Sequence, residues 1–275
     1  MATGEYLSTL KKYLEKEPQI SLSFLFGSLA KGFIKEESDF DLAIYLQNPD
    51  EEERIWFEIT RIIKRELDLV YLNGAPASLV SNIFKTGIPL VIKDKSLYLE
   101  LYLKKTLEAE DFFEWTKDYY RIYKNARSLI PEEKTRLLQR MQFLETEYKE
   151  IDNFSRYNFK EYQQDKFKRR NIERWVENIL NATIDISKII LASAKRQMPK
   201  TYEEALFDFG IFIGLEEEVA QKFAKFGNLR NILAHEYLDL IYNKIQNFIQ
   251  EAPLVYTRLF SFLKEFMGET DDIPH

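Results

Sequence analysis

The stretch from Phe24 to Leu46, FLFGSLAKGFIKEESDFDLAIYL, constrains this chain most. A hydrophobic strand is expected over 20–26, and it breaks at Gly27-Ser28. A short basic loop or helix follows, and then Asp39 and Asp41 open a second apolar run. Side chains alternate faces along a strand, so these two carboxylates point to the same side.

The paired carboxylates and the glycine turn together predict a site for a phosphate and a metal ion. Two neighbouring carboxylates repel each other unless a cation lies between them. Mg²⁺ takes such oxygen ligands together with the phosphates of a substrate. Gly27 allows the backbone to approach a phosphate closely. The Ser28 hydroxyl and the amides that begin the next helix would then bind that phosphate.

The pattern Gly-Ser, ten residues, Asp-x-Asp also carries a family resemblance. It resembles the minimal nucleotidyltransferases (MNT) of the polymerase-β superfamily. The resemblance implies that Gly27 and Ser28 hold the triphosphate of ATP and that three carboxylates hold Mg²⁺. Lys31 stands where many members have Arg, so its phosphate contact would not be bidentate. Asp68 matches the third metal ligand, on a neighbouring strand; the alternative is a surface residue at a strand end.

Composition excludes several classes of protein. The formal net charge of −6 argues against a protein that coats nucleic acid, although a local basic groove is compatible with it. The chain has no cysteine, which excludes a disulfide framework and a thiolate metal site. We see no apolar run of transmembrane length and no signal peptide, so we expect a cytoplasmic protein without a membrane partner.

Periodicity predicts an α+β N-terminal domain, a small mixed sheet with helices, followed by an all-α helical bundle. Helical and strand patterns alternate as far as Asp94-Lys95, and no strand pattern follows Leu97. We expect a nucleotidyltransferase domain over 1–108, a connecting helix over 109–130 and the bundle over 131–275. Within the bundle we expect a loop or frayed helix over 154–163, separate helices ending at Phe226 and starting at Leu229, and an interruption near Pro253.

A second motif, Arg230-Asn231-Ile232-Leu233-Ala234-His235-Glu236-Tyr237, lies in the bundle. Asn231 and His235 are four residues apart and share a helix face, with Arg230 beside it. A guanidinium stabilises charge on a phosphate, and an imidazole moves a proton to or from an oxygen. These three residues suit RNA cleavage without a metal when a 2′-hydroxyl attacks. The alternative is a structural histidine packed on a helix.

This motif carries the second resemblance. Arg-Asn-x3-His resembles the HEPN superfamily, and Arg-x4-His-x-Tyr resembles the HepT-type toxins that are encoded beside MNT-type antitoxins. The resemblance implies an RNase that is silenced when AMP from ATP is transferred to the tyrosine, here Tyr237. The chain would then be a self-regulating toxin–antitoxin protein. The alternative for Tyr237 is ordinary aromatic packing.

The spacing of the motif also bears on assembly. Arg230 and His235 are five residues apart, about 140° around an ideal helix. Either the helix is distorted, or a second copy completes the site. The family is dimeric here, so we expect a homodimer through the helical domain. A basic cluster (Lys166, Lys168, Arg169, Arg170, Arg174) either follows an RNA backbone or is a solvated helix face.

Two rival functions remain open. The chain could be a small-molecule or aminoglycoside nucleotidyltransferase whose helical half forms the acceptor site. It could also be a non-catalytic interaction module attached to a nucleotide sensor. The Arg-Asn-x3-His-x-Tyr motif is the feature against the first rival, and transfer of label from ATP separates all three.

Overall fold

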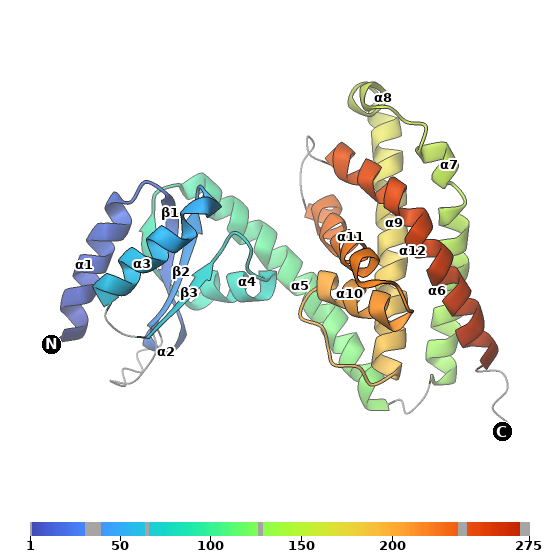
Figure 1. Ribbon diagram of the computed structural model, residues 1–275, viewed down its shortest axis with the longest axis horizontal. Helices are drawn as coiled ribbons and strands as arrows, with labels where there is room; N and C mark the ends of the chain where they lie inside the picture. The colour runs from blue at the N-terminus through green and yellow to red at the C-terminus, as the bar shows by residue number, and fades with distance from the viewer. Residues whose placement is uncertain (1, 31–39, 64–65, 126–128, 236–240, 270–275) are drawn as a thin grey trace. The chain divides into compact units, whose positions relative to one another are not determined.

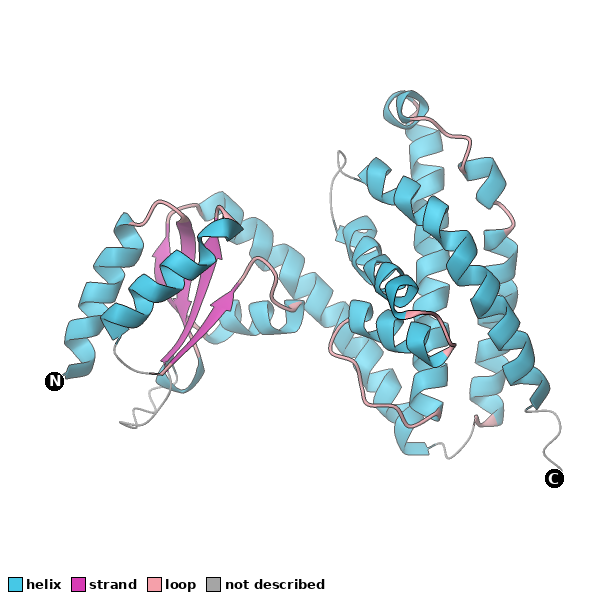
Figure 2. Ribbon diagram, viewed as in Figure 1, coloured by secondary structure: helices cyan, strands magenta, loops and turns pink. Residues whose placement is uncertain are grey.

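The computed structural model describes residues 2–30, 40–63, 66–125, 129–235 and 241–269. The chain divides into two compact units, Met1–Asp111 and Phe112–His275. One long helix, α5 (Lys95–Asn125), contributes to both units. The limits predicted for the nucleotidyltransferase domain, 1–108, and for the helical bundle, 131–275, remain predictions. Strands occur only in the N-terminal unit among the described residues (Figures 1 and 2).

The N-terminal unit is built on a mixed sheet with the strand order β3-β2-β1-β4. β1 pairs antiparallel with β2 and β4, while β2 pairs parallel with β3. The predicted fold class of this half is therefore confirmed. Its elements are α1 (Ala2–Lys16), β1 (Ile20–Leu25), α2 (Gly27–Ala30), β2 (Phe40–Leu46), the 3-10 turn η1 (Pro49–Glu51), α3 (Glu52–Ile63), β3 (Leu67–Tyr71), α4 (Ala77–Thr86), β4 (Ile88–Ile92) and the start of α5.

Helices cover both faces of this sheet because the strands are apolar on both sides. Leu42 and Ile44 of β2 pack in one core with residues of α1 and α3. Ala43 and Tyr45, which point the opposite way, pack with residues of α4 and the start of α5. The sheet is thus the middle layer of three, and polar side chains are accommodated where its strands begin.

The C-terminal unit is helical in its described residues, as predicted. Its helices after α5 are α6 (Pro131–Tyr148), α7 (Ile151–Phe154), α8 (Phe159–Gln164), α9 (Lys166–Ser193), α10 (Tyr202–Phe212), α11 (Glu217–His235) and α12 (Ile241–Glu269). Among the described residues, α9 supplies more buried side chains than any other helix, since its residues from Ile179 to Ser193 are almost all buried. Within the described chain, no helix combines the length and the apolar character that crossing a membrane requires.

One predicted boundary in this unit is wrong. α11 runs without a break through Gly227, where we expected one helix to end and another to begin. The glycine serves close packing here, because a Cβ on Gly227 would lie 2.7 Å from the backbone of Tyr202 and of Glu203. The segment 154–163, expected as a loop or frayed helix, is non-helical over 155–158 and then forms the short α8, whose start is fixed by reciprocal hydrogen bonds between Asn158 and Glu161.

The expected interruption near Pro253 is also wrong, because α12 continues through this residue. Proline lacks an amide hydrogen and crowds the carbonyl four residues earlier, which disfavours a helix interior. Pro253 lies on the exposed side of α12, whereas Ala252, Val255 and Tyr256 are buried. Burial of the residues around it therefore outweighs the local preference.

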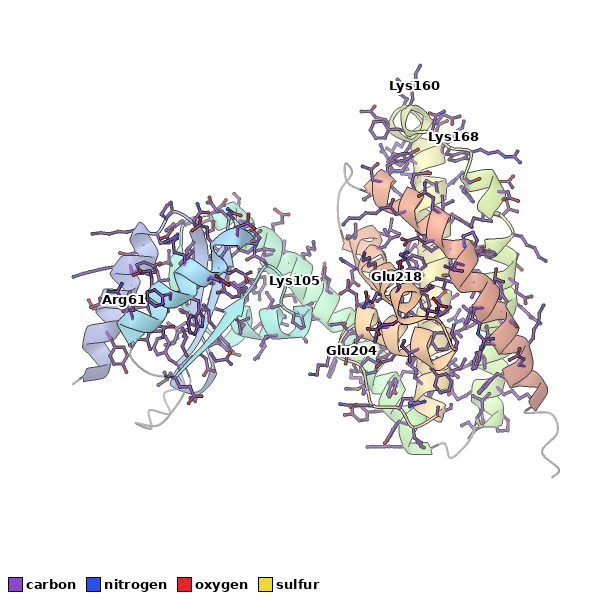
Figure 3. The ribbon with its side chains drawn as sticks, viewed as in Figure 1. Arg61, Lys105, Lys160, Lys168, Glu204 and Glu218 are labelled. Atoms are coloured by element: carbon purple, nitrogen blue, oxygen red, sulfur yellow. The ribbon has the colours of Figure 1, made fainter. Side chains whose placement is uncertain are left out.

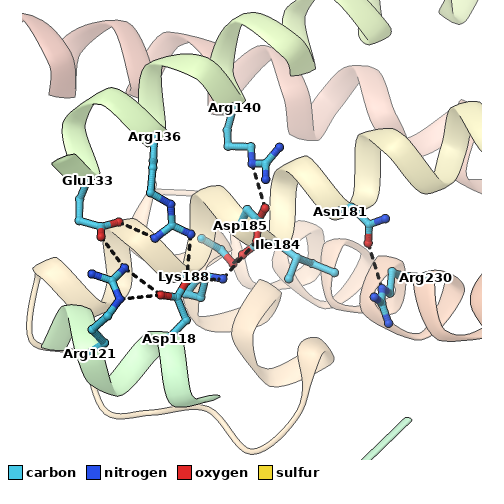
Figure 4. A network of polar contacts seen from close by, with 11 residues as sticks. Asp118, Arg121, Glu133, Arg136, Arg140, Asn181, Ile184, Asp185, Lys188 and Arg230 are labelled. Atoms are coloured by element: carbon cyan, nitrogen blue, oxygen red, sulfur yellow. Dashed lines mark hydrogen bonds and ion pairs between the residues drawn. The ribbon is translucent and has the colours of Figure 1, made fainter. Parts of the chain in front are cut away.

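An ionic cluster joins α5, α6 and α9 (Figure 4). Asp118 of α5 contacts Arg136 of α6 at 3.0 Å and Lys188 of α9 at 2.8 Å. Glu133 of α6, which is 1% exposed, binds Arg136 and Arg121. Burial raises the pKa of Asp118, but the hydrogen bonds from Arg136 and Lys188 outweigh it and hold the pKa well below its ordinary value.

Candidate functional site

The N-terminal candidate site lies where β2 and β3 begin. Asp41 and Asp68 are register partners across the parallel pair of strands. Residues in register on neighbouring strands project from the same face, so the two carboxylates lie side by side. They share the face that α4 and the start of α5 cover farther along the strands. Asp41 is half-buried and Asp68 is exposed, so this edge of the sheet is open to solvent.

Gly27 lies directly against Asp41. The backbone amide of Phe26 donates to the Asp41 carbonyl oxygen at 3.0 Å, which joins the end of β1 to the start of β2. Gly27 then turns with φ +71°, a conformation that favours glycine. A Cβ on Gly27 would overlap the Oδ2 atom of Asp41, so the site requires glycine for space as well as for conformation. Ser28 follows in α2.

Two predicted residues of this site, Lys31 and Asp39, lie outside the described residues. The structure therefore brings together Gly27, Ser28, Asp41 and Asp68. In the part of the chain that the structure describes, no group of three acidic or histidine side chains is close enough to hold a metal ion. Of the three predicted metal ligands Asp39, Asp41 and Asp68, the structure describes Asp41 and Asp68.

The C-terminal candidate site is built on α11. Arg230 is half-buried, and its Nε donates to Oδ1 of Asn181 on α9 at 3.0 Å (Figure 4). Its guanidinium also lies over the ring of Tyr202, the first residue of α10, with 5.1 Å from Cζ to the ring centroid. Arg230 is therefore bound by side chains of two other helices.

The rest of the predicted motif is partly described. Asn231 is half-buried, and its Oδ1 has no contact with solvent and no hydrogen bond to the residues described. A buried acceptor left without a donor is costly, so such an atom is often explained by function. His235 is the last residue of α11, the helix that also carries Arg230 and Asn231. Tyr237 lies outside the described residues.

Two members of the basic cluster near the start of α9 are paired with neighbouring acids. Lys168, at the α8 end of α9 (Figure 3), contacts Glu161 at 2.7 Å. Arg174 contacts Glu177 at 2.9 Å. These pairs are typical of a solvated helix face, the second of the two interpretations given above.

Comparison with known proteins decides the family. Residues 144–266 match the family model described as ribonuclease HepT-like. The curated tRNA nuclease HepT of Aphanizomenon flos-aquae is 33% identical over 103 residues, 36% of this chain and 70% of that protein. The chain belongs to the HepT-like ribonuclease family. Residues 8–96 match a second model, polymerase beta, nucleotidyltransferase, so a nucleotidyltransferase domain precedes the HepT-like domain.

Solved structures of toxin–antitoxin complexes show weaker likeness. One, described as a toxin–antitoxin with AMP-PNP, is 19% identical, covers 39% of this chain and 87% of that chain, and has a TM-score of 0.33. Another contains the tri-AMPylated Shewanella oneidensis HEPN toxin with its MNT antitoxin. It is 17% identical, covers 38% of this chain and 88% of that chain, and has a TM-score of 0.31. Both scores are low, so neither likeness bears on the chemistry of this chain.

The sequence did not identify the residues that bind Arg230 in the HepT-like domain. Asn181 lies in a run of α9 whose neighbours Leu180 and Ala182 are buried. A polar amide within such an apolar run was the sequence signal that could have pointed to Asn181. Tyr202 gave no comparable signal, because the chain contains 16 tyrosines and many of them pack in the core.

Proposed function

We propose that this chain transfers AMP from ATP to Tyr237 and thereby silences an RNase activity of its HepT-like domain. The observation that carries the proposal is the register pairing of Asp41 with Asp68 beside Gly27. A nucleotidyltransferase needs carboxylates and a close backbone approach to phosphate at one place. The second domain carries Arg230, Asn231 and His235 on one helix.

In the transfer step, Gly27, Ser28 and Lys31 would bind the triphosphate, and Asp39, Asp41 and Asp68 would hold Mg²⁺. The paired Asp41 and Asp68 fit this ion, since both present carboxylate oxygens on one open face. Bound Mg²⁺ would neutralise charge on the phosphates and the leaving group. The Tyr237 oxygen forms a bond to the α-phosphorus, the bond to the bridging oxygen breaks, and pyrophosphate leaves. The phenolic proton passes to water.

In the RNA step, a 2′-hydroxyl of the substrate attacks the adjacent phosphorus and the 5′-oxygen leaves. Arg230 stabilises the charge on the phosphate, and His235 moves the proton between the two oxygens. Asn231 supplies a polar contact beside them. No metal ion takes part in this step. Because the curated relative is a tRNA nuclease, we propose tRNA as the substrate class.

AMP transfer and RNA cleavage are linked because the AMP acceptor lies close in sequence to the cleavage residues. Tyr237 is two residues beyond His235. An AMP group on Tyr237 adds bulk and negative charge, which repels an RNA phosphate from Arg230 and His235. We also propose that the helical domain forms a homodimer, which would bring motif residues of two copies together.

Mass spectrometry tests the transfer step. Intact purified chain is incubated with Mg²⁺, with and without ATP, beside the variants Asp41→Asn and Tyr237→Phe. The mass is expected to rise in steps of one AMP group in the parent chain only. A parallel incubation contains labelled ATP and an aminoglycoside. Transfer of the label to the aminoglycoside, with no mass gain by the protein, would favour the small-molecule nucleotidyltransferase. Nucleotide binding without any transfer would favour the sensor.

A further inference from the structure

We propose that Asn181 and Tyr202 are positioning residues that fix the guanidinium of Arg230 for RNA cleavage. This inference rests on the RNase activity proposed above and adds the residues that set its geometry. Arg230 comes from α11, Asn181 from α9 and Tyr202 from α10. Side chains from three helices therefore meet at Arg230, although the sequence motif itself contains neither Asn181 nor Tyr202.

The hydrogen bond to Asn181 fixes the edge of the guanidinium. The Nε of Arg230 donates to Oδ1 at 3.0 Å, across a sequence separation of 49 residues. Asn181 is itself half-buried on a helix whose neighbouring residues are packed in the core. An acceptor on so rigid an element holds its partner more accurately than an acceptor on a loop.

The ring of Tyr202 fixes the face of the guanidinium. The Cζ atom of Arg230 is 5.1 Å from the ring centroid, a distance at which a cation is attracted to an aromatic face. Tyr202 is 4% exposed, and its ring packs edge-on against Phe112 at 5.1 Å and Trp115 at 5.9 Å. The aromatic surface under Arg230 is therefore itself held in place.

Gly227 allows the two helices to come this close. It lies three residues, almost one turn, before Arg230 on α11. A Cβ at this position would lie 2.7 Å from the carbonyl carbon of Tyr202. Any other residue would push α11 away from the start of α10, and the Arg230 side chain would move away from the Tyr202 ring.

Such constraints matter because arginine is long and the guanidinium is planar. Ordering an arginine side chain costs about 2 kcal/mol of rotamer entropy, and its pairing with phosphate oxygens depends on the orientation of the plane. The hydrogen bond at Nε and the contact with the Tyr202 ring order the Arg230 side chain before RNA binds, so this entropy is not lost again on binding. Loss of the Asn181 contact should therefore slow the cleavage step more than it weakens RNA binding.

The test compares Asn181→Leu with Asn181→Asp, and uses Asn178→Leu as the matched control. Asn178 is also half-buried on α9, and its Nδ2 donates to Glu147 of α6 at 3.1 Å, so its loss removes a similar hydrogen bond that does not involve Arg230. With a tRNA substrate and no ATP, N181L is expected to lower kcat about 10- to 100-fold with KM within about 3-fold. N181D keeps an acceptor of the same shape and is expected to retain most of the activity, as is N178L.

Combining N181L with a substitution of Arg230 distinguishes a positioning role of Asn181 from a general loss of folding or activity. In Arg230→Ala, adding N181L is expected to cause no further loss, because Asn181 acts through Arg230. Equal losses from N181L in both backgrounds, or equal losses from N181L and N178L, would overturn the inference. Should N181L melt below N178L, Asn181→Ser repeats the comparison with a side chain too short to reach. Full cleavage by R230A would instead refute the proposed function.

Discussion

At the scale of single residues, the N-terminal site depends on the contact between Gly27 and Asp41. Gly27 adopts φ +71° and leaves no room for a Cβ beside the Asp41 carboxylate. Asp41 in turn is in register with Asp68 on the next strand. The backbone hydrogen bonds of the sheet thus hold a glycine and two acids from different strands within one small region.

We predict that Gly27→Ala lowers the rate of AMP transfer at least about 100-fold, since misplacement of a reacting group by about 1 Å has this effect. The alanine methyl group would displace the Asp41 carboxylate, and the positive φ adds strain of about 1–2 kcal/mol. Gly74→Ala is the matched control, because a Cβ there meets no atom within 4 Å. The rate is measured by intact mass over time; equal rates for G27A and G74A would contradict this account of the site.

At the scale of secondary-structure elements, the HepT-like domain is held together by packing and by one ionic cluster. α10 and α11 pack closely where Gly227 meets the start of α10. The cluster of Asp118, Arg136 and Lys188 joins α5, α6 and α9, and Lys188 is 7% exposed. Without Asp118, Lys188 still contacts Asp185 at 3.2 Å and Arg136 still contacts Glu133 at 2.9 Å, so each cation keeps one carboxylate partner.

The lowered pKa of Asp118 predicts a loss of stability in acid. Its hydrogen bonds with Arg136 and Lys188 stabilise the folded state above the unfolded pKa, near the ordinary value of 3.8, and this contribution is lost as pH falls below it. Asp118→Asn is expected to lower the free energy of unfolding by about 1.5–3 kcal/mol at pH 7, the contribution typical of hydrogen bonds to a charged group, and to flatten the profile below pH 4. Urea unfolding at several pH values measures both. An unchanged acid profile in D118N would show that other groups cause the loss.

The continuous α12 gives a second prediction at this scale. Pro253→Ala restores a helical amide on the exposed side, so we expect the free energy of unfolding to rise by as much as about 3 kcal/mol. Leu254→Ala is the control, since this side chain is 60% exposed and should change stability by less than about 0.5 kcal/mol. Thermal unfolding compares the two; a less stable P253A would mean that the proline is needed where it stands.

The sequence predicted most elements of the fold because their apolar periodicity is regular. The strand expected over 20–26 is observed as β1, Ile20–Leu25, and it ends at the glycine turn where a break was expected. The errors occurred at Gly227 and Pro253, where local preference opposes the observed helix and contacts distant in sequence decide. For the same reason the partners of Arg230 could not be predicted: Asn181 is 49 residues away. The position of Asp68 on the strand next to Asp41 was predicted from the family resemblance, whereas the register between them is known only from the structure.

At the scale of the whole molecule, one chain carries both a nucleotidyltransferase domain and a HepT-like domain. Arg230 and His235 are five residues apart on one helix, so an undistorted helix directs them about 140° apart. A second copy of the chain would supply the missing partner at each site. The proposal of a homodimer follows from this spacing and from the family resemblance.

We therefore expect light scattering at micromolar concentration to give the mass of two chains. Mixing R230A with His235→Ala is expected to restore part of the tRNA cleavage that each variant lacks alone, because a mixed dimer would contain one site with both residues intact. A monomer that cleaves tRNA at full rate would show that a single helix completes the site.

If AMP transfer controls RNA cleavage by this chain, cleavage must fall as AMP is added to the protein. The same preparation is assayed for tRNA cleavage before and after incubation with ATP and Mg²⁺, while intact mass reports AMP on the protein. The account predicts that cleavage falls in proportion to AMP added, and that Tyr237→Phe gains no AMP and gives a cleavage rate that ATP does not change. Cleavage that persists at full AMP occupancy, or that falls in Y237F as well, would contradict it.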